Sequence, residues 1–114
     1  MRWAAVVLAV LAAAPAAAAP PARLQVVARE FTLSLSRPKL RAGPAIVELV
    51  NFGEDLHDLR LRRVGGTRTY SIPNLRPGRH AELRVRLLPG RYKLWCSVAN
   101  HRALGMRAIL IVRL

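Results

Sequence analysis

Apolar and polar residues alternate with a period of two along most of this chain. In the run 31–36 every second residue is apolar, and the residues between them are Thr or Ser. Strict alternation is typical of a β-strand that buries one face and exposes the other. The same pattern predicts strands over residues 24–30, 45–50, 57–63, 81–87, 91–96 and 107–112, and a weaker one over 68–71.

Proline and glycine interrupt the alternation at short intervals, at residues 37–38, 42–44, 65–66, 76–78 and 88–90. Short strands separated in this way are the pattern of an antiparallel sandwich. No segment has the periodicity of a strong amphipathic helix. We therefore predict an all-β fold, a single Greek-key β-sandwich or barrel of about seven to eight strands.

The first residues lack this alternation. Arg2 precedes an uninterrupted apolar run over residues 4–14, and alanines surround the positions before Pro20. These features are typical of a secretory signal peptide. A retained membrane anchor is the alternative, but a spanning helix needs roughly 20 apolar residues. We predict a signal peptide over residues 1–18, with cleavage between 18 and 22, and one domain over 19–114 that is periplasmic or otherwise exported.

Cys96 is the only cysteine in the chain, so no disulfide can form within it. In an exported protein such a residue is a free thiol, an intermolecular partner or a metal ligand. His101 and Met106 follow it at equal steps of five residues. Two histidines, a cysteine and a weak axial methionine make a blue-copper site. His57, which opens a predicted strand after a glycine-containing turn, is the candidate for the second histidine.

Several segments, in this order, resemble the cupredoxin family of small blue-copper proteins, to which plastocyanin, rusticyanin and auracyanin belong. They are residues 27–31, 42–44, 51–58, 76–78 and 88–96, and then 101–106, which follow Cys96 with a rusticyanin-like spacing. The resemblance implies a cupredoxin-like copper-binding domain over residues 19–114. It also implies one type 1 copper ion with the equatorial ligands His57, Cys96 and His101 and the axial ligand Met106.

The chain departs from the family pattern at four positions. Ala99 and Asn100 stand where the family often has Pro-Gly, and Ala108 stands where it often has glycine. Asp58 replaces an asparagine whose side chain helps to tie the two ligand segments together. A carboxylate can accept the same hydrogen bonds, but its charge favours Cu(II). Our hypothesis is that Asp58 lowers the reduction potential.

Other residues near these segments receive less specific interpretations. His80 follows a turn and has no sulfur near it in sequence, so we expect a surface residue. Trp95 precedes the cysteine and should face away from the copper, either as packing or as part of a second electron route. The resemblance implies an apolar patch around His101 through which electrons pass, formed by Leu56, Ala99, Ala103 and Leu104.

The chain has 19 basic and 6 acidic residues, for a net charge of +13. Such a charge is often a sign of nucleic-acid binding, but the predicted export and the alternation of arginines with apolar residues over 81–87 argue against it. One interpretation is that the basic residues form a solvated face. The other is that they attract acidic redox partners or an anionic membrane surface, with Arg60 and Arg102 near the site. We expect a monomer and no nucleic-acid partner.

The predicted function is an exported blue-copper protein that shuttles single electrons between redox partners by Cu(I)/Cu(II) cycling. The alternative is a periplasmic copper-binding protein for copper storage, delivery or resistance. We do not expect an enzyme, because three histidines in total cannot supply a second copper centre. Paired carboxylates, or a nucleophile with a base, are also not apparent in the sequence.

Overall fold

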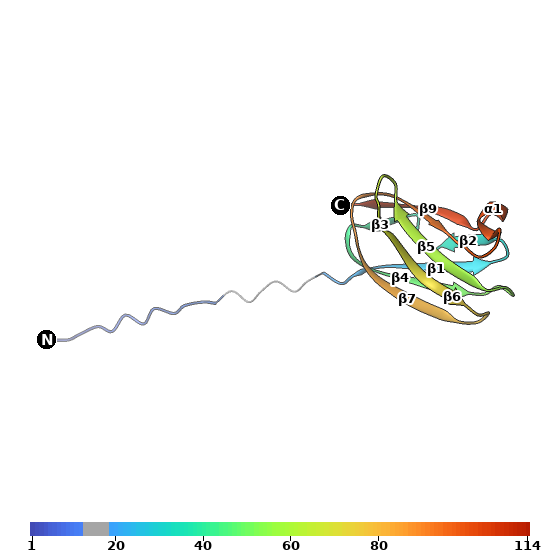
Figure 1. Cartoon of the computed structure of the whole chain (residues 1–114). Helices are drawn as coiled ribbons and strands as arrows, with labels where there is room; N and C mark the ends of the chain where they lie inside the picture. The colour runs from blue at the N-terminus through green and yellow to red at the C-terminus, as the bar shows by residue number, and fades with distance from the viewer. Residues whose placement is uncertain (13–18) are drawn as a thin grey trace.

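The computed structural model describes residues 1–12 and 19–114. Residues 1–12 are exposed and form neither helix nor strand (Figure 1). Within the described residues, no helix has the length and apolar character that crossing a membrane requires. The cleavage position after Ala18 lies outside the described residues, and export stays a prediction.

In the described part of the chain, nine strands form two sheets (Figure 1). The four-stranded sheet has the order β2-β1-β4-β7, and the five-stranded sheet has the order β3-β9-β8-β5-β6. The strands of the first sheet are β1 (Ala22–Arg29), β2 (Thr32–Leu35), β4 (Gly43–Asn51) and β7 (His80–Leu87). Those of the second are β3 (Lys39–Arg41), β5 (His57–Arg63), β6 (Thr69–Leu75), β8 (Gly90–Trp95) and β9 (Arg107–Arg113).

Alternation along the strands places the core between the two sheets. On β8, Tyr92 and Leu94 are buried, whereas Arg91 and Lys93 are exposed. The buried residues of both sheets form one hydrophobic cluster. Burial of one face of each sheet is the main stabilising contribution in such a sandwich. The predicted all-β sandwich is therefore confirmed.

The described residues form nine strands, one more than the upper end of the predicted number, and the additional strand is β3. It has only three residues, too few to show alternation, and it pairs in parallel with β9 through Leu40 and Val112. The weak strand predicted over 68–71 is the longer β6, which contains Pro73. Proline lacks a backbone N–H, and β6 tolerates it because it is the edge strand of its sheet.

One end of the five-stranded sheet collects the segments that carry the predicted ligands. Strand β5 begins at His57, β8 ends at Trp95 and β9 begins at Arg107. Because β8 is antiparallel to both of its neighbours, these three strand ends lie at the same edge of the sheet. A short helix, α1 (His101–Leu104), follows β8 at this edge. Figure 1 shows α1 at the opposite end of the sandwich from the C-terminus.

Candidate metal centre

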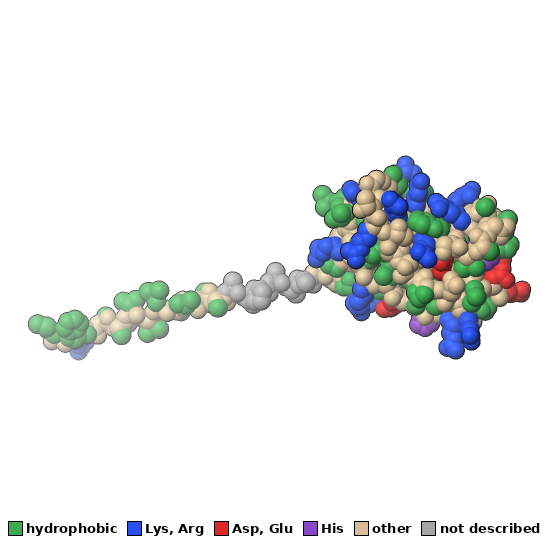
Figure 2. Space-filling model, viewed as in Figure 1, with side chains coloured by type: hydrophobic (Ala, Val, Ile, Leu, Met, Phe, Trp, Pro, Cys, Tyr) green, Lys and Arg blue, Asp and Glu red, His purple; other side chains and the backbone are tan. Residues whose placement is uncertain are grey.

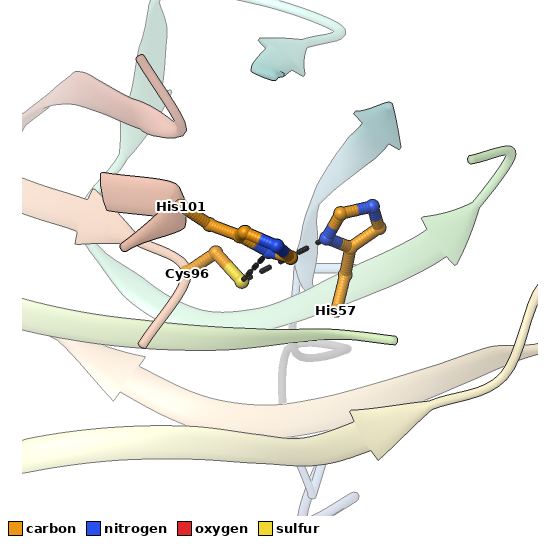
Figure 3. A group of neighbouring side chains, drawn as sticks. All are labelled: His57, Cys96 and His101. Atoms are coloured by element: carbon orange, nitrogen blue, oxygen red, sulfur yellow. Dashed lines mark hydrogen bonds between the residues drawn. The ribbon is translucent and has the colours of Figure 1, made fainter. Parts of the chain in front are cut away.

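Three of the four predicted ligand residues converge on one buried point. The Sγ atom of Cys96 lies 3.8 Å from Nδ1 of His57 and 3.7 Å from Nδ1 of His101. Their potential ligand atoms all lie within 4.8 Å of one another. Figure 3 shows the two imidazole rings directed toward the same sulfur. The structure thus brings together residues that are up to 44 positions apart, as the sequence analysis predicts.

The spacing of these atoms fits a metal ion. Typical protein bonds to a transition metal such as Zn²⁺ are about 2.3 Å to sulfur and about 2.0–2.1 Å to imidazole nitrogen. In a trigonal arrangement these lengths separate sulfur from each nitrogen by roughly 3.8 Å. The two observed distances agree with this value, and both nitrogens are of the same kind, Nδ1. The donor set of one thiol and two imidazoles suits copper.

Met106 is fully buried at the same pole. Its backbone N–H donates to the carbonyl oxygen of His101 at 3.0 Å, and its own carbonyl accepts from the Cys96 N–H at 3.1 Å. These two hydrogen bonds hold the methionine beside both neighbouring ligand residues. The His57, Cys96, His101 and Met106 cluster is typical of one type 1 copper site. Axial ligation by the Met106 sulfur stays a prediction.

A carboxylate fixes the orientation of His57. Nε2 of His57 lies 2.9 Å from Oε1 of Glu30, and the imidazole is completely buried. The same oxygen accepts the backbone N–H groups of Asp55 at 2.7 Å and Glu54 at 2.8 Å. These backbone hydrogen bonds, the one from Asp55 above all, lower the pKa of Glu30 from 4.5 to about 2. Outer carboxylates of this kind set the ring orientation and raise the basicity of a metal-binding histidine.

Two residues shape the loop between β4 and β5 around that carboxylate. A Cβ atom at Gly53 would lie only 2.5 Å from Oε1 of Glu30, so the close approach needs glycine. The buried Asn51 donates from Nδ2 to the carbonyl oxygens of Asp55 and Leu75, at 2.8 and 2.9 Å. Its Oδ1 accepts the Gly53 N–H at 2.8 Å. This loop is therefore held by side chains that bind its backbone.

Asp58 links the two ligand segments, as the resemblance to the family implies. It is 4% exposed, and its Oδ1 accepts the backbone N–H of Ser97 at 2.6 Å. The Ser97 hydroxyl donates to its other oxygen. Residue 58 follows one ligand and residue 97 follows another, so this contact fixes the spacing between His57 and Cys96. The predicted effect of the Asp58 charge on the potential stays a hypothesis.

The second ligand segment departs from the family pattern without losing its geometry. Ala99 has a φ of +44°, a left-handed conformation that is uncommon for residues other than glycine. Asn100 precedes α1 but makes no side-chain hydrogen bond to it. Gly105 ends the helix at a φ of +130°, and a Cβ there would lie 2.8 Å from the carbonyl oxygen of Phe31. That glycine lets the chain turn back toward Met106.

The thiol of Cys96 is not accessible to solvent. Desolvation by burial is the main cause that raises its pKa above the ordinary value. Metal ions bind the thiolate, so a metal that enters this site has to displace a proton. The buried neutral thiol and the metal-bound thiolate are thus the two states that this pocket has to accommodate.

Burial confirms the predicted exposure of the remaining residues, and a role for any of them in electron transfer stays a prediction. His80 is a surface residue whose side chain is 67% exposed. Trp95 points outward from β8, while its neighbours Leu94 and Cys96 are buried. All four residues of the expected apolar patch are exposed: Leu56, Ala99, Ala103 and Leu104.

Sequence reasoning also missed the carboxylates that face the two histidines. Glu30 contacts His57, and Oδ2 of Asp55 lies 3.5 Å from Nε2 of His101. Neither follows a local pattern, since Glu30 is 27 residues away from its histidine. Segment 51–58 resembles the family, but its sequence does not reveal that Glu30 contacts it.

No protein family profile and no curated protein matches the sequence of the chain. The fold, in contrast, matches solved structures. The dithionite-reduced auracyanin of Roseiflexus castenholzii superposes with a TM-score of 0.66 at 15% sequence identity, over 81% of this chain and 97% of the other. An auracyanin B matches with a TM-score of 0.67 at 19% identity, over 86% and 94% of the two chains.

A copper-containing nitrite reductase from Thermus scotoductus also matches, with a TM-score of 0.56 and 23% identity. That match covers 90% of this chain but only 25% of the enzyme. The fold therefore occurs both as a small protein and as part of a larger enzyme. The chain has the cupredoxin fold, and one pole of it holds the histidine, cysteine and methionine cluster that is typical of a single type 1 copper ion.

Proposed function

We propose that this protein is a type 1 blue-copper protein that carries single electrons by cycling copper between Cu(I) and Cu(II). One observation carries the proposal. A single buried thiol has two imidazole nitrogens at nearly equal distances, 3.7 and 3.8 Å, with a buried methionine beside them. This is the donor set of a blue-copper electron-transfer site.

Rigidity of the ligand residues supports electron transfer. Copper, when bound, supplies the one-electron chemistry, and the chain supplies donors that suit both of its oxidation states: soft sulfur for Cu(I) and imidazole nitrogen for Cu(II). His57 is held by Glu30, and Cys96 is tied to Asp58 through Ser97. Ligands that are fixed at strand ends move little when the charge of the metal changes, so little reorganisation opposes the transfer.

The comparisons support a redox role and a small carrier. One of the similar structures is an auracyanin in its dithionite-reduced form, and this chain covers 97% of that protein. The nitrite reductase is matched over only a quarter of its length. Apart from the cluster around Cys96, the described residues contain no second group of histidine, cysteine and carboxylate ligands. We propose that the chain acts without catalysing a reaction of its own and that it works after export.

The experiment that tests this proposal compares copper retention in the two oxidation states. The copper-loaded protein is titrated electrochemically and then exposed to a Cu(I) chelator and a Cu(II) chelator in turn. A carrier shows a reversible one-electron wave and keeps its copper in both states. Rapid loss of Cu(I) to the chelator, with Cu(II) retained, contradicts the carrier and supports copper storage or delivery instead.

A further inference from the structure

The outward face of the five-stranded sheet is strongly basic. Its strands contain one acidic residue, Asp58, which is buried and bonded to Ser97. The same strands carry nine lysine and arginine residues, all exposed except the half-buried Arg63: Lys39, Arg41, Arg60, Arg62, Arg63, Arg91, Lys93, Arg107 and Arg113. The strands of the other sheet carry four arginines and two glutamates, so the five-stranded sheet is the more basic of the two.

Strand register places Trp95 at the centre of the cations nearest to the metal site. Trp95 lies directly opposite Arg60 on β5 and opposite Arg107 on β9. Directly paired residues on one face have Cβ atoms about 4.5–5.5 Å apart. The guanidinium of Arg102 lies 4.6 Å from the centre of the indole ring. We call this set the Trp95 face: Arg60, Arg62, Lys93, Trp95, Arg102 and Arg107.

The Trp95 face is concave on both sides of Arg102. One groove is lined by Arg62, Lys93, Trp95 and Arg102 together with the turn at residues 63–67. A second groove is lined by Lys93, Arg102 and Arg107 together with residues of β8 and β9. Among the described residues, only Arg60 of this face has a carboxylate within 4.0 Å, the buried Asp58 at 3.5 Å. The other cations form no ion pair within the described residues, although Arg62 and Arg107 each donate one hydrogen bond to a backbone carbonyl oxygen.

The end of the molecule beside His101 has the opposite character. Glu30, Glu54 and Asp55 lie together there, and Asp55 approaches the imidazole of His101. Figure 2 shows acidic side chains gathered at the end that holds α1, while lysine and arginine are spread over much of the visible surface. The carboxylates beside His101 repel an acidic partner and the Trp95 face attracts it, because like charges at an interface are unfavourable.

We propose that the Trp95 face docks an acidic surface loop of a partner protein. Carboxylate side chains that protrude from such a loop reach the arginines along both grooves, with bidentate pairing that suits guanidinium groups. A flat bilayer surface reaches only the rims of the grooves. Nucleic-acid bases stack on aromatic rings, but Arg102 already covers the ring of Trp95.

This docking surface lies next to the metal centre. Trp95 directly precedes Cys96, so a partner bound at the Trp95 face is one residue from the buried thiol. The identification of the partner as a redox protein rests on the proposed function. The electrostatic docking does not, since it depends only on the charges and the register of the sheet.

The test uses the full chain, with and without copper, and a hexaglutamate peptide as the probe. In a nitrogen-15 NMR titration we expect the largest shifts at the Trp95 indole N–H and at the amides of residues 60, 93 and 107. Binding should weaken steeply as salt is added, because the charges are exposed and screened. The largest shifts at residues 52–56 or on the other sheet would contradict the proposal.

Two matched double variants separate the effect of where the charge lies from the effect of net charge. Arg62→Glu with Lys93→Glu alters the Trp95 face, where the two residues are directly paired. Arg84→Glu with Arg86→Glu makes the same charge change at exposed positions of β7 on the other sheet. We expect the first pair to weaken peptide binding by roughly tenfold or more and the second pair by less than about twofold. Equal losses would overturn the proposal, because net charge alone would then explain the binding.

Two further probes decide between kinds of partner. Vesicles of phosphatidylglycerol and phosphatidylcholine, and a single-stranded oligothymidylate, are titrated against the same two pairs of variants. If either probe binds more tightly than the peptide, and only the first pair of substitutions abolishes that binding, the proposed protein partner is overturned in favour of a membrane or a nucleic acid. If all variants show a thiolate-to-copper band, a negative docking result overturns the docking proposal and leaves the proposed function intact. If the unaltered protein lacks the band, the proposed function is refuted and the docking proposal is not.

Discussion

The cluster is built from two segments that are held in different ways. The first ligand segment, residues 51–58, carries His57 and is fixed by side chains that bind backbone groups. Glu30 and Asn51 make these contacts. The second ligand segment, residues 96–106, carries Cys96, His101 and Met106 and is fixed by hydrogen bonds between backbone groups.

Backbone hydrogen bonds run through the whole second segment. The N–H of His101 donates to the carbonyl of Val98 at 3.0 Å, and the N–H of Gly105 donates to Arg102 at 3.2 Å. The bonds of Met106 to His101 and Cys96 then close the turn. This segment needs the correct backbone conformation at a few positions, and the Ser97 hydroxyl, which donates to Asp58, adds a side-chain contact to these backbone hydrogen bonds.

The difference separates two properties of the site. In the first segment, charges near His57 can be altered while the backbone keeps its course, so substitutions should change the reduction potential. In the second segment, a substitution that a backbone angle does not permit should displace the ligands and lower the stability. The predictions that follow test this separation.

The largest effect is expected for Gly105→Ala. The new Cβ would lie 2.8 Å from a backbone carbonyl, at a φ of +130°. We expect a loss of about 3 kcal/mol in the free energy of unfolding, from backbone strain together with the clash. Thermal or denaturant unfolding measures it. Gly65→Ala is the control, since its φ is +80° but nothing lies within 4 Å. Its expected cost is about 1–2 kcal/mol, and an equal cost for both variants would contradict the role of the second segment.

Asp58 connects the two segments, and two substitutions separate its roles. Asp58→Ala removes the acceptor of the Ser97 N–H and should cost about 2 kcal/mol, because hydrogen bonds to a charged group are lost. Asp58→Asn keeps an acceptor and removes the charge, so the stability should change less. The reduction potential should rise, on the order of tens of millivolts, because Cu(II) loses a nearby negative charge. An unchanged or lowered potential would refute the hypothesis about this carboxylate.

The smallest change in stability is expected for Glu30→Gln. Glutamine keeps an oxygen for the backbone N–H groups of residues 54 and 55 but removes the charge beside His57. The potential should rise, since a less basic imidazole favours Cu(II) less. Gly53→Ala offers an independent route, because its Cβ would displace the Glu30 carboxylate. Redox titration of both variants checks the prediction, and a fall in potential in either would break the distinction between the segments.

Local patterns explain what the sequence predicts correctly. The alternation in residues 31–36 and the proline and glycine turns are patterns of a few neighbouring residues. They therefore predict a sandwich without any knowledge of which strands pair. Cys96, His101 and Met106 lie in one short segment, and copper chemistry then requires a further histidine. His57 is identified by chemistry and by its place at the start of a strand.

Contacts between distant strands explain what the sequence does not reveal. Glu30 ends the predicted strand 24–30, and only the packing of β1 against the loop before β5 brings it to His57. The cations around Trp95 come from β5, β8 and β9 and meet through strand register. Arg60 and Arg102 are predicted near the site, but the sequence does not reveal that the guanidinium of Arg102 lies over the ring of Trp95. Such juxtapositions depend on pairing, which no periodicity encodes.

The visible spectrum of the copper-loaded protein tests the central claim most directly. The purified chain receives one equivalent of Cu(II), and Cys96→Ser serves as the matched variant. We expect a strong thiolate-to-copper absorption that disappears on reduction and is missing from the variant. Copper that binds without this absorption, or an absorption that survives in Cys96→Ser, would contradict it.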